Sequence, residues 1–231
     1  FNMDKEKIPI HISIIPDGNR RWAKSHGLSA VKGYSKVDYN HLESLILEAK
    51  NLGAKYLSLW LFSTENWKRP KVEIDFLFNH FLKNTDSLLN GAIKNKVKIM
   101  HLGRKDRLPK SVIEGLNLLE TQTKGNNEFT VLICMDYGGR DEILRAVNYV
   151  LKSGQNSVSE EEFKNYLDSK DIPDPDLVIR TSGEKRLSGF MPFQAVYSEF
   201  YFTDMHFPDF GPKELRVAIE DYSKRKRRLG N

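Results

Sequence analysis

The residues best suited to chemistry in this chain come directly after an apolar, β-branched run. Residues 11–22 read HISIIPDGNRRW, so a buried strand would end at Asp17, a glycine and two arginines. Open parallel sheets bind ligands at this end of their strands, and helix N-termini attract phosphate. There Asp17 could hold a magnesium ion while Arg20 and Arg21 bind the phosphate that the metal neutralises. The alternative is a tight Asp-Gly turn with solvated arginines.

Two further polar segments also follow predicted strands. Residues 63–70 read STENWKRP and come after Phe62, and residues 180–188 read RTSGEKRLS and come after Ile179. Each has a simpler interpretation, a helix N-cap for the first and a solvated loop for the second. Because the carboxyl ends of parallel strands share one edge of a sheet, we expect all three segments to line one cleft.

The predicted cleft is rich in cationic donors and poor in carboxylates. Guanidinium groups match phosphate oxygens two at a time, so this set of side chains favours a phosphate or diphosphate ligand. The sequence contains no Walker A, Gly-x-Gly-x-x-Gly, His-Glu-x-x-His or Gly-x-Ser-x-Gly pattern. Nucleotide hydrolysis, dinucleotide redox and serine esterase chemistry are therefore disfavoured. The cationic residues are Arg20, Arg21, Arg69, Arg180 and Arg186.

The pattern of apolar residues predicts the elements that position these segments. The 231 residues, 39% hydrophobic and 29% charged, are typical of one globular domain over 1–231, with residues 1–8 flexible and a basic C-terminal segment over 223–231. Strands alternate with helices, which predicts an α/β fold with a mostly parallel six-stranded sheet flanked by helices on both faces. The expected strands are 10–15, 56–62, 97–102, 129–135, 177–179 and 199–203, and the expected helices are 42–49, 74–89, 112–119, 142–151, 160–167 and 213–222.

The single cysteine and the net charge of +5 narrow the class of protein further. Cys134 lies in an apolar run, so we expect a buried, inert thiol, and His11 inside a strand is expected to be a hydrogen-bonded core residue. We expect no signal peptide or membrane span, and hence a cytoplasmic protein. The basic run 224–228 could bind nucleic acid or an anionic membrane surface, and the small net charge argues against nucleic acid.

Taken together, the three segments resemble the cis-prenyltransferase family of the undecaprenyl diphosphate synthase type. The family's Asp-Gly-Asn-x-Arg-Trp loop stands at 17–22, its Ser-x-Glu-Asn-Trp-x-Arg-Pro segment at 63–70 and its Arg-Thr-x-Gly-Glu-x-Arg-x-Ser segment at 180–188. Residues 228–230 are similar to the family's C-terminal Arg-x-Gly. The resemblance covers the chain from about residue 11 to its end, and three ordered motifs make chance agreement negligible.

The resemblance implies an enzyme that condenses isopentenyl diphosphate with an allylic diphosphate, farnesyl diphosphate first among them, into a cis-polyprenyl diphosphate. It implies Mg²⁺ as cofactor and an apolar tunnel between the sheet and the helix at 74–89. Leu61 faces this tunnel where many members have a smaller residue, which suggests a shorter product. The resemblance also implies a homodimer, because residues 228–230 would reach a second copy's active site. The basic run beside them could contact the membrane where the lipid product leaves.

The resemblance further implies roles for single residues. Asp17 and Glu199 would be the metal ligands, although an isolated carboxylate such as Glu199 is usually a surface residue. Asn66 would be catalytic with Asp17, relaying the proton lost after carbon–carbon bond formation, and Trp22 and Trp67 would wall the prenyl groups. The allylic diphosphate would meet Gly18, Asn19, Arg20, Arg21 and Arg69, the isopentenyl diphosphate would meet Arg180, Arg186 and Ser188, and Ser63, Thr64, Glu65 and Leu187 would also contact substrate.

Some positions depart from the family pattern. Pro16 stands where most members carry methionine, and Tyr34 and Lys185 stand where many carry histidine. Residues 191–193 read Met-Pro-Phe in place of Leu-Leu-Trp. Such prolines resemble irregular, lavandulyl-type synthases, but those generally lack the Asn-Trp pair found here at 66–67, so we favour regular elongation. An irregular synthase and a non-catalytic partner subunit are the alternatives.

Overall fold

Six parallel strands form the centre of the computed structural model, which describes residues 7–226. The strand order is β3-β4-β2-β1-β5-β6, and every neighbouring pair is parallel, so all carboxyl ends point to one edge of the sheet. The predicted α/β fold with a six-stranded parallel sheet is confirmed. The strands are β1 (His11–Ile15), β2 (Tyr56–Ser63), β3 (Val97–Leu102), β4 (Phe129–Tyr137), β5 (Leu177–Arg180) and β6 (Glu199–Phe202).

Helices follow most strands, and each predicted helix is present with ends that differ by a few residues. The sequence analysis did not predict α2, a seven-residue helix. Its Gly33 lies against the carbonyl of Asn19, where a Cβ would stand only 1.8 Å away, so tertiary packing on α1 places it. The helices are α1 (Asn19–Ser25), α2 (Ala30–Lys36), α3 (Tyr39–Leu52), α4 (Lys71–Lys94), α5 (Lys110–Thr123), α6 (Gly139–Lys152), α7 (Glu160–Lys164) and α8 (Pro212–Lys224), and short 3₁₀ turns are η2 (Thr64–Lys68), η3 (Gln194–Tyr197) and η4 (Phe207–Asp209).

The sheet is buried on both faces, and each face has its own apolar core. Successive strand residues point to opposite sides. Ile12 and Val131 belong to the larger core, which also contains side chains of α3, α4, α5 and α8. Leu132 and Val178 face the other way and pack with apolar residues of the segment 187–195. Burial on both faces is the usual condition of a parallel sheet.

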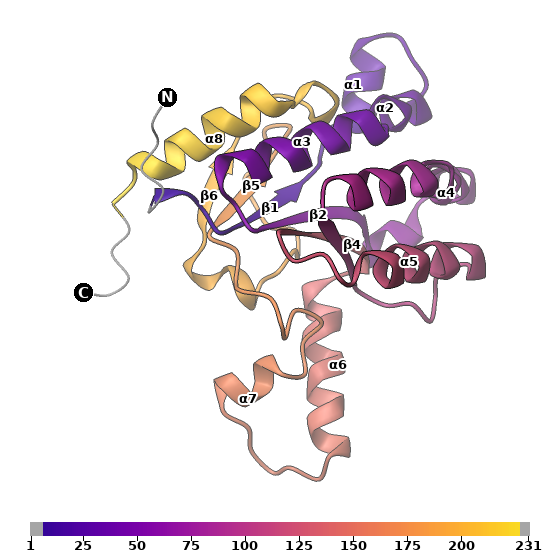
Figure 1. The fold of residues 1–231 in the computed structure, drawn as a ribbon. Coiled ribbons are helices and arrows are strands. Elements are labelled where there is room, and N and C mark those ends of the chain that lie inside the picture. The colour runs from indigo at the N-terminus through magenta and orange to yellow at the C-terminus, as the bar shows by residue number, and fades with distance from the viewer. Residues whose placement is uncertain (1–6, 227–231) are drawn as a thin grey trace.

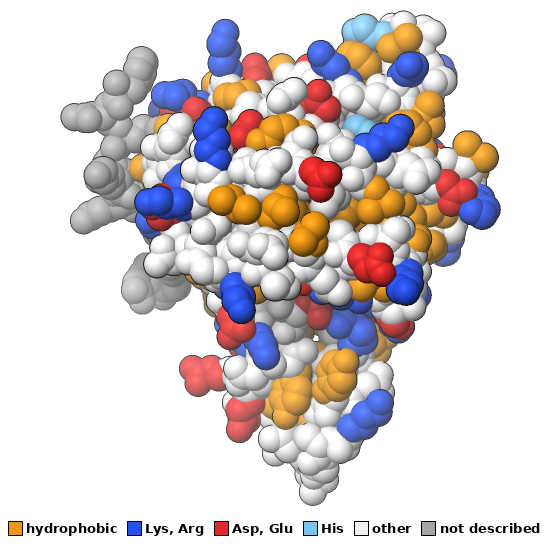
Figure 2. All heavy atoms as spheres, turned by 45° about the vertical axis from the view of Figure 1, so that its right-hand side comes forward, with side chains coloured by type: hydrophobic (Ala, Val, Ile, Leu, Met, Phe, Trp, Pro, Cys, Tyr) orange, Lys and Arg blue, Asp and Glu red, His pale blue; other side chains and the backbone are white. Residues whose placement is uncertain are grey.

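One part of the molecule, α6 with α7, projects from the body (Figure 1). Leu144, Val147 and Leu151 lie three and four residues apart on α6 and are exposed. Figure 2 shows apolar side chains on this projecting part. No helix within residues 7–226 has the length and apolar character needed to cross a membrane.

Two expectations about single core residues are confirmed. Cys134 is buried, and burial raises the pKa of its thiol well above the ordinary value. His11 is also buried; its Nδ1 donates to the carbonyl of Pro173 at 2.7 Å, and its Nε2 accepts from the Ser58 hydroxyl at 2.7 Å. Because a carbonyl can only accept, the proton of the neutral ring is on Nδ1. Both residues are structural.

The pairing of β2 with β4 shifts twice near the carboxyl edge. β2 contains one extra residue, Leu61, opposite the step from Cys134 to Met135, and β4 contains one extra residue, Asp136, opposite the step from Phe62 to Ser63. Such bulges break the alternation of side chains and redirect them. Leu61 and Phe62 consequently both face the side of the sheet that α3, α4, α5 and α8 cover.

Candidate active site

A cavity of about 670 Å³ lies at the carboxyl edge of the sheet. Its polar end is built by the segments that follow β1, β2 and β5, and its apolar end lies between β2, α3 and α4. The three polar segments recognised in the sequence therefore converge on one cavity. The predicted site residues that line it are Asp17, Gly18, Asn19, Arg20, Arg21, Ser63, Glu65, Asn66, Arg69, Arg180, Arg186 and Ser188.

Asp17 stands at the polar end, and its backbone is fixed by β5. The Thr181 hydroxyl accepts from the Asp17 N–H at 2.9 Å and donates to the Asp17 carbonyl at 2.7 Å. The N–H of Gly18 donates to Asp17 Oδ1 at 2.7 Å. Gly18 has a φ of 99°, and a Cβ there would stand 2.5 Å from Ser182 Oγ, so this turn requires glycine.

The Asp17 carboxylate is paired with two arginines. Arg180 Nη2 lies 3.0 Å from Asp17 Oδ2, and Arg21 Nη2 lies 3.1 Å from Asp17 Oδ1. Burial alone would raise the pKa of Asp17, but the hydrogen bond from Arg180 and the charge of Arg21 outweigh burial and hold that pKa below its ordinary value. Asp17 is therefore ionised at neutral pH.

Arg180 is buried and ties the end of β5 to the loop that follows it. Its Nη1 donates to Ser188 Oγ at 2.7 Å and to the carbonyl of Arg186. Ser188 has a φ of 53°, a strained conformation that often marks functional sites. Among the residues that the structure describes, the buried Nε of Arg180 has no hydrogen-bond partner. An unpaired donor beside the cavity suits an anionic oxygen.

Glu184 lines the cavity although the sequence analysis did not select it. Its Oε1 lies 3.2 Å from Arg21 Nη1, and its Oε2 lies 2.6 Å from Arg186 Nη1. One carboxylate thus holds together an arginine that follows β1 and an arginine that follows β5. Its position inside the motif at 180–188 was the available signal.

A second group that sequence analysis did not assemble surrounds Arg69. Arg69 Nη1 donates to the Tyr34 hydroxyl and to Glu73 Oε1, both at 2.8 Å, and Tyr34 donates to the same oxygen at 2.8 Å. Arg20 Nη1 lies 3.7 Å from Glu73 Oε2. Burial raises the pKa of Tyr34 to about 12, so its hydroxyl keeps its proton. The four-residue spacing from Arg69 to Glu73 could have signalled the ion pair.

The other end of the cavity is apolar and adjoins a second void. This smaller void, of about 30 Å³, lies between α3, α4 and the sheet. Leu42, Leu61 and Leu88 line both spaces and form a common wall. Two adjoining apolar spaces therefore lie beside the helix at 74–89, and the continuous tunnel that the resemblance implies stays a prediction. The apolar side chains that line the larger one include Leu42, Leu61, Leu77, Phe78, Phe81 and Leu88.

Four predicted substrate-binding residues do not line the cavity. Trp22 Nε1 donates to Asp209 Oδ1 at 2.8 Å, and Trp67 Nε1 donates to Asp136 Oδ1 at 2.8 Å. Each tryptophan thereby anchors its motif segment to a distant part of the chain. The other two residues are Thr64, which approaches Gly138, and Leu187, which packs with the core on the opposite face of the sheet.

Glu199, the predicted second metal ligand, lies at the opposite edge of the sheet from Asp17. It is the first residue of β6 and pairs with Leu177, whereas Arg180, the partner of Asp17, is the last residue of β5. Three strand residues separate these positions by about 10 Å. Glu199 Oε2 lies 2.7 Å from Arg225 Nη1. A single chain therefore does not bring the two carboxylates together.

Asp17 fits the donor set for magnesium. Within residues 7–226, no three His, Cys, Asp or Glu side chains form a group that could hold a metal ion. Mg²⁺ is usually held by one or two carboxylates together with substrate phosphates and water. Asp17 is ionised and lies among arginines suited to phosphate, so it matches that mode of binding.

The sequences of known proteins resemble this chain over nearly its whole length. The model of the family described as "Putative undecaprenyl diphosphate synthase" matches residues 15–230. The isoprenyl transferase of Fusobacterium nucleatum is 44% identical over 226 residues, which cover 98% of this chain and 97% of that protein. The isoprenyl transferase of Thermotoga maritima is 44% identical over 228 residues, which cover 97% of each. These relatives define the chain as a prenyl-transferring enzyme.

Two solved structures share the fold. Lavandulyl diphosphate synthase from Lavandula x intermedia, in complex with dimethylallyl diphosphate, superposes with a TM-score of 0.93 at 33% identity, over 98% of this chain and 100% of that one. A probable undecaprenyl diphosphate synthase from Campylobacter jejuni superposes with a TM-score of 0.81 at 33% identity, over 96% and 99%. The chain belongs to the undecaprenyl diphosphate synthase family of cis-prenyltransferases, enzymes that elongate prenyl chains.

Proposed function

We propose that the protein condenses isopentenyl diphosphate with an allylic diphosphate, farnesyl diphosphate first, to form a cis-polyprenyl diphosphate and release diphosphate. The observation that carries this proposal is one cavity that joins an arginine-rich end around Asp17 to an apolar end at Leu61. A prenyl diphosphate has the same two halves. The curated relatives, which are named isoprenyl transferases, support the same reaction class.

In this proposal the polar end binds two diphosphates side by side. Asp17 contacts both Arg21 and Arg180, and Glu184 contacts both Arg21 and Arg186, so the two binding regions adjoin. The incoming phosphates would take over contacts that carboxylates now make, since arginine pairs equally well with either anion. Arg20, Arg21 and Arg69 would bind the allylic diphosphate, and Arg180, Arg186 and Ser188 would bind the isopentenyl diphosphate.

The chemistry needs negative charge to be stabilised as the allylic diphosphate leaves and a proton to be removed afterwards. Asp17 would hold Mg²⁺, which when bound neutralises charge on the departing diphosphate. Since Glu199 lies at the other edge of the sheet, we assign the metal to Asp17 only. Asn66 Oδ1 accepts the Ser63 N–H at 3.1 Å, which orients the amide at the cavity wall. An amide is not basic, so Asn66 would relay the proton.

A turnover assay tests this proposal. The protein is incubated with labelled isopentenyl diphosphate and farnesyl diphosphate, with Mg²⁺ or with EDTA, and the products are identified by mass spectrometry. We expect polyprenyl diphosphates that differ by one isoprene unit, formed only with Mg²⁺. Absence of label in any product with dimethylallyl, geranyl and farnesyl diphosphate alike would reject the proposal.

Irregular condensation is the second candidate. The observation in its favour is the TM-score of 0.93 with lavandulyl diphosphate synthase, against 0.81 with the Campylobacter jejuni protein. Incubation with dimethylallyl diphosphate alone separates the two reactions. A branched ten-carbon product formed without isopentenyl diphosphate would replace regular elongation as the function.

We also propose that two copies associate through the projecting α6. Its exposed Leu144, Val147 and Leu151 form an apolar stripe of the kind that marks protein interfaces. Light scattering should give twice the mass of the chain, and Leu144→Glu with Leu151→Glu should give the monomer mass. The motif at 228–230 that suggested the dimer lies outside the described residues.

Sedimentation with anionic vesicles would test the membrane contact predicted for the run 224–228, and the cytoplasmic location stays a prediction.

A further inference from the structure

The turn that carries Asn66 is tied to the sheet by a buried carboxylate, Asp136, to which the sequence analysis gave no role. We infer that Asp136 is a positioning residue for prenyl transfer. It holds η2 through the indole of Trp67 and so keeps Asn66 at the cavity wall. The inference rests on the proposed function, in which Asn66 relays a proton.

Asp136 occupies an unusual position at the end of β4. It is the extra residue of a bulge and has a φ of 51°, in the left-handed region that disfavours most side chains. Its side chain is fully buried. Strained, buried residues persist where the surrounding contacts require them, and they are common at functional sites. The contacts of the Asp136 carboxylate therefore need to hold this residue in its left-handed conformation.

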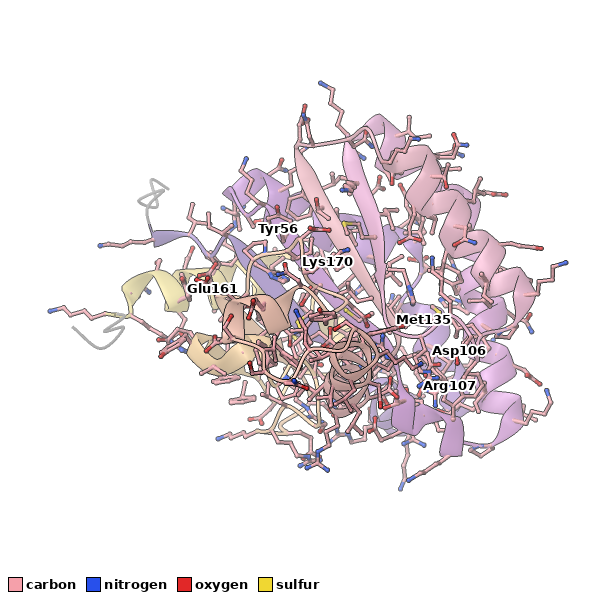
Figure 3. All side chains as sticks on the ribbon, turned by 90° about the horizontal axis from the view of Figure 1, so that it is seen from below. Tyr56, Asp106, Arg107, Met135, Glu161 and Lys170 are labelled. Carbon is pink, nitrogen blue, oxygen red and sulfur yellow. The ribbon has the colours of Figure 1, made fainter. Side chains whose placement is uncertain are left out.

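Three N–H groups from two other segments converge on this carboxylate. Trp67 Nε1 donates to Oδ1 at 2.8 Å, Arg107 Nε donates to Oδ2 at 2.9 Å, and Arg107 Nη2 donates to Oδ1. Figure 3 labels Arg107 beside Met135, the residue that precedes Asp136. The N–H of Arg104 also donates to the Asp136 carbonyl at 3.1 Å. The segments that follow β2 and β3 are therefore both joined to the end of β4 at one residue.

Trp67, which Asp136 holds in place, packs against residues that line the cavity. Its ring packs edge-on against Phe62, with centroids 5.2 Å apart, and is tilted against Phe78 at 5.6 Å. Phe62 and Phe78 both line the cavity. Trp67 directly follows Asn66 in η2, so an indole fixed by Asp136 also fixes the backbone that presents the Asn66 amide.

Two other contacts show how closely η2 is seated on β4. Ser63 and Asn66 form a capping box at the start of the turn. A Cβ at Gly138 would stand only 2.3 Å from Thr64 Oγ1, so glycine permits the close approach. Asn66 thus lies between an anchor at Ser63 and an anchor at Trp67, and the second exists only because Asp136 is buried there.

A positioning role and a merely structural role have different kinetic signatures. Arg180 and Arg186, which would bind the isopentenyl diphosphate, lie at and beyond the end of β5, on the other half of the sheet from β4. The Asp136 carboxylate is instead hydrogen-bonded to Trp67 and Arg107. A displaced η2 should therefore lower kcat and leave the KM for isopentenyl diphosphate unchanged. A structural role would lower the temperature of unfolding and leave kcat per folded molecule unchanged.

Four variants of the full chain test the inference. Trp67→Phe keeps the ring but removes the N–H, and Asp136→Ala removes the acceptor. Asp136→Asn keeps an acceptor for Trp67 and tolerates the left-handed backbone. Asp106→Asn, in an exposed ion pair of the same loop as Arg107, is the matched control. We expect Trp67→Phe and Asp136→Ala to lower kcat about ten- to a hundredfold, Asp136→Asn to restore most of it, and the control to equal the wild type.

The double variant completes the test. If the two residues act through one hydrogen bond, Trp67→Phe with Asp136→Ala should lose no more activity than either alone. A wild-type kcat for Trp67→Phe would overturn the inference even if Asp136→Ala fails to fold, and losses that multiply in the double variant would overturn it too. A wild-type protein without activity would instead reject the proposed function, so the two failures are distinguishable.

Discussion

Asp17 and Arg180 are 163 residues apart in the chain, yet their side chains are hydrogen-bonded at 3.0 Å at the polar end of the cavity. The pair connects the segment after β1 with the end of β5, and these are the two regions that would bind the two diphosphates. Its disruption should therefore affect catalysis more than stability.

We expect Asp17→Asn to lower kcat at least about a hundredfold, because it removes the charge that would hold Mg²⁺ beside the leaving diphosphate. Initial rates at saturating Mg²⁺ measure the effect. Asp75→Asn, in an exposed ion pair with Lys71 on α4, is the control and should retain full activity. Turnover by Asp17→Asn at the wild-type rate would contradict the role given to this carboxylate.

The pH dependence of activity should reflect the lowered pKa of Asp17. Its two arginine partners hold the carboxyl pKa below the ordinary value, so the ionised form persists into mildly acidic solution. Activity that depends on ionised Asp17 should fall only below pH ~4, the ordinary value for aspartate. Replacing the partner, as in Arg180→Gln, should move that acid limb to higher pH. Rates for the two proteins from pH ~3 to ~7 would show whether the limb moves.

Tyr34→Phe should raise the KM for the allylic diphosphate about fivefold with little change in kcat. The variant removes a hydroxyl that accepts from Arg69 and donates to Glu73, so Arg69 loses one of the two contacts that orient it. A net loss of about 1 kcal/mol is typical for such a bond. Steady-state rates at saturating isopentenyl diphosphate give the KM. An unchanged value would show that Arg69 is held well enough by Glu73 alone.

Leu61 should control the length of the product. It is the bulged residue of β2 and stands in the wall between the large cavity and the smaller apolar void. Leu61→Ala would join the two spaces and should lengthen the product by one or more isoprene units, whereas Leu61→Phe should shorten it. Mass spectrometry of the products measures both effects. If both variants give the wild-type distribution, another part of the cavity limits the chain.

His11 should make the protein less stable as the pH falls from about 6.5 to about 4. Burial lowers the pKa of His11 from 6.5 to about 4, and the hydrogen bond to Pro173 opposes this only in part. In that range the unfolded chain binds a proton that the folded chain does not, so the free energy of unfolding decreases with decreasing pH. The full effect is about 3 kcal/mol and is absent above pH ~7.

Urea unfolding of the wild type and of His11→Gln at several pH values measures the contribution of His11 to the free energy of unfolding. The variant has no titrating ring at that position, so its stability should depend less steeply on pH. His41 and His101, whose pKa values burial also lowers, are present in both proteins and cancel in the comparison. Equal slopes would show that His11 has the same pKa in the folded and unfolded chains, which would contradict the lowered value.

The order of the elements and the location of the site could be predicted from local sequence. Apolar runs such as 97–102 identify strands because a parallel strand is buried on both faces, and the alternation with helices makes the sheet parallel. Parallel strands in turn place their following segments at one edge. That topological rule was enough to bring Asp17, Arg69 and Arg180 to one cavity.

The partners that lie far along the chain were decided only by the tertiary structure. Trp22 and Trp67 were expected to wall the substrate, but neither lines the cavity. Their indole N–H groups donate to Asp209 and Asp136, which come from far along the chain. Glu199 was expected to meet Asp17, but strand register places it at the other edge of the sheet.

The sequence by itself determined which chemical groups the site contains, namely its arginines and the carboxylate of Asp17. It also determined that the sheet is parallel. Both can be predicted from residue types and from the local periodicity of apolar residues, which involve only residues close together in the chain. The tertiary structure decided which distant carboxylates pair with Arg21 and Arg180, where two bulges redirect Leu61 and Asp136, and how η2 is anchored. Such long-range pairings depend on register and on contacts across more than 60 residues of chain, as between Trp67 and Asp136, and no local pattern encodes them.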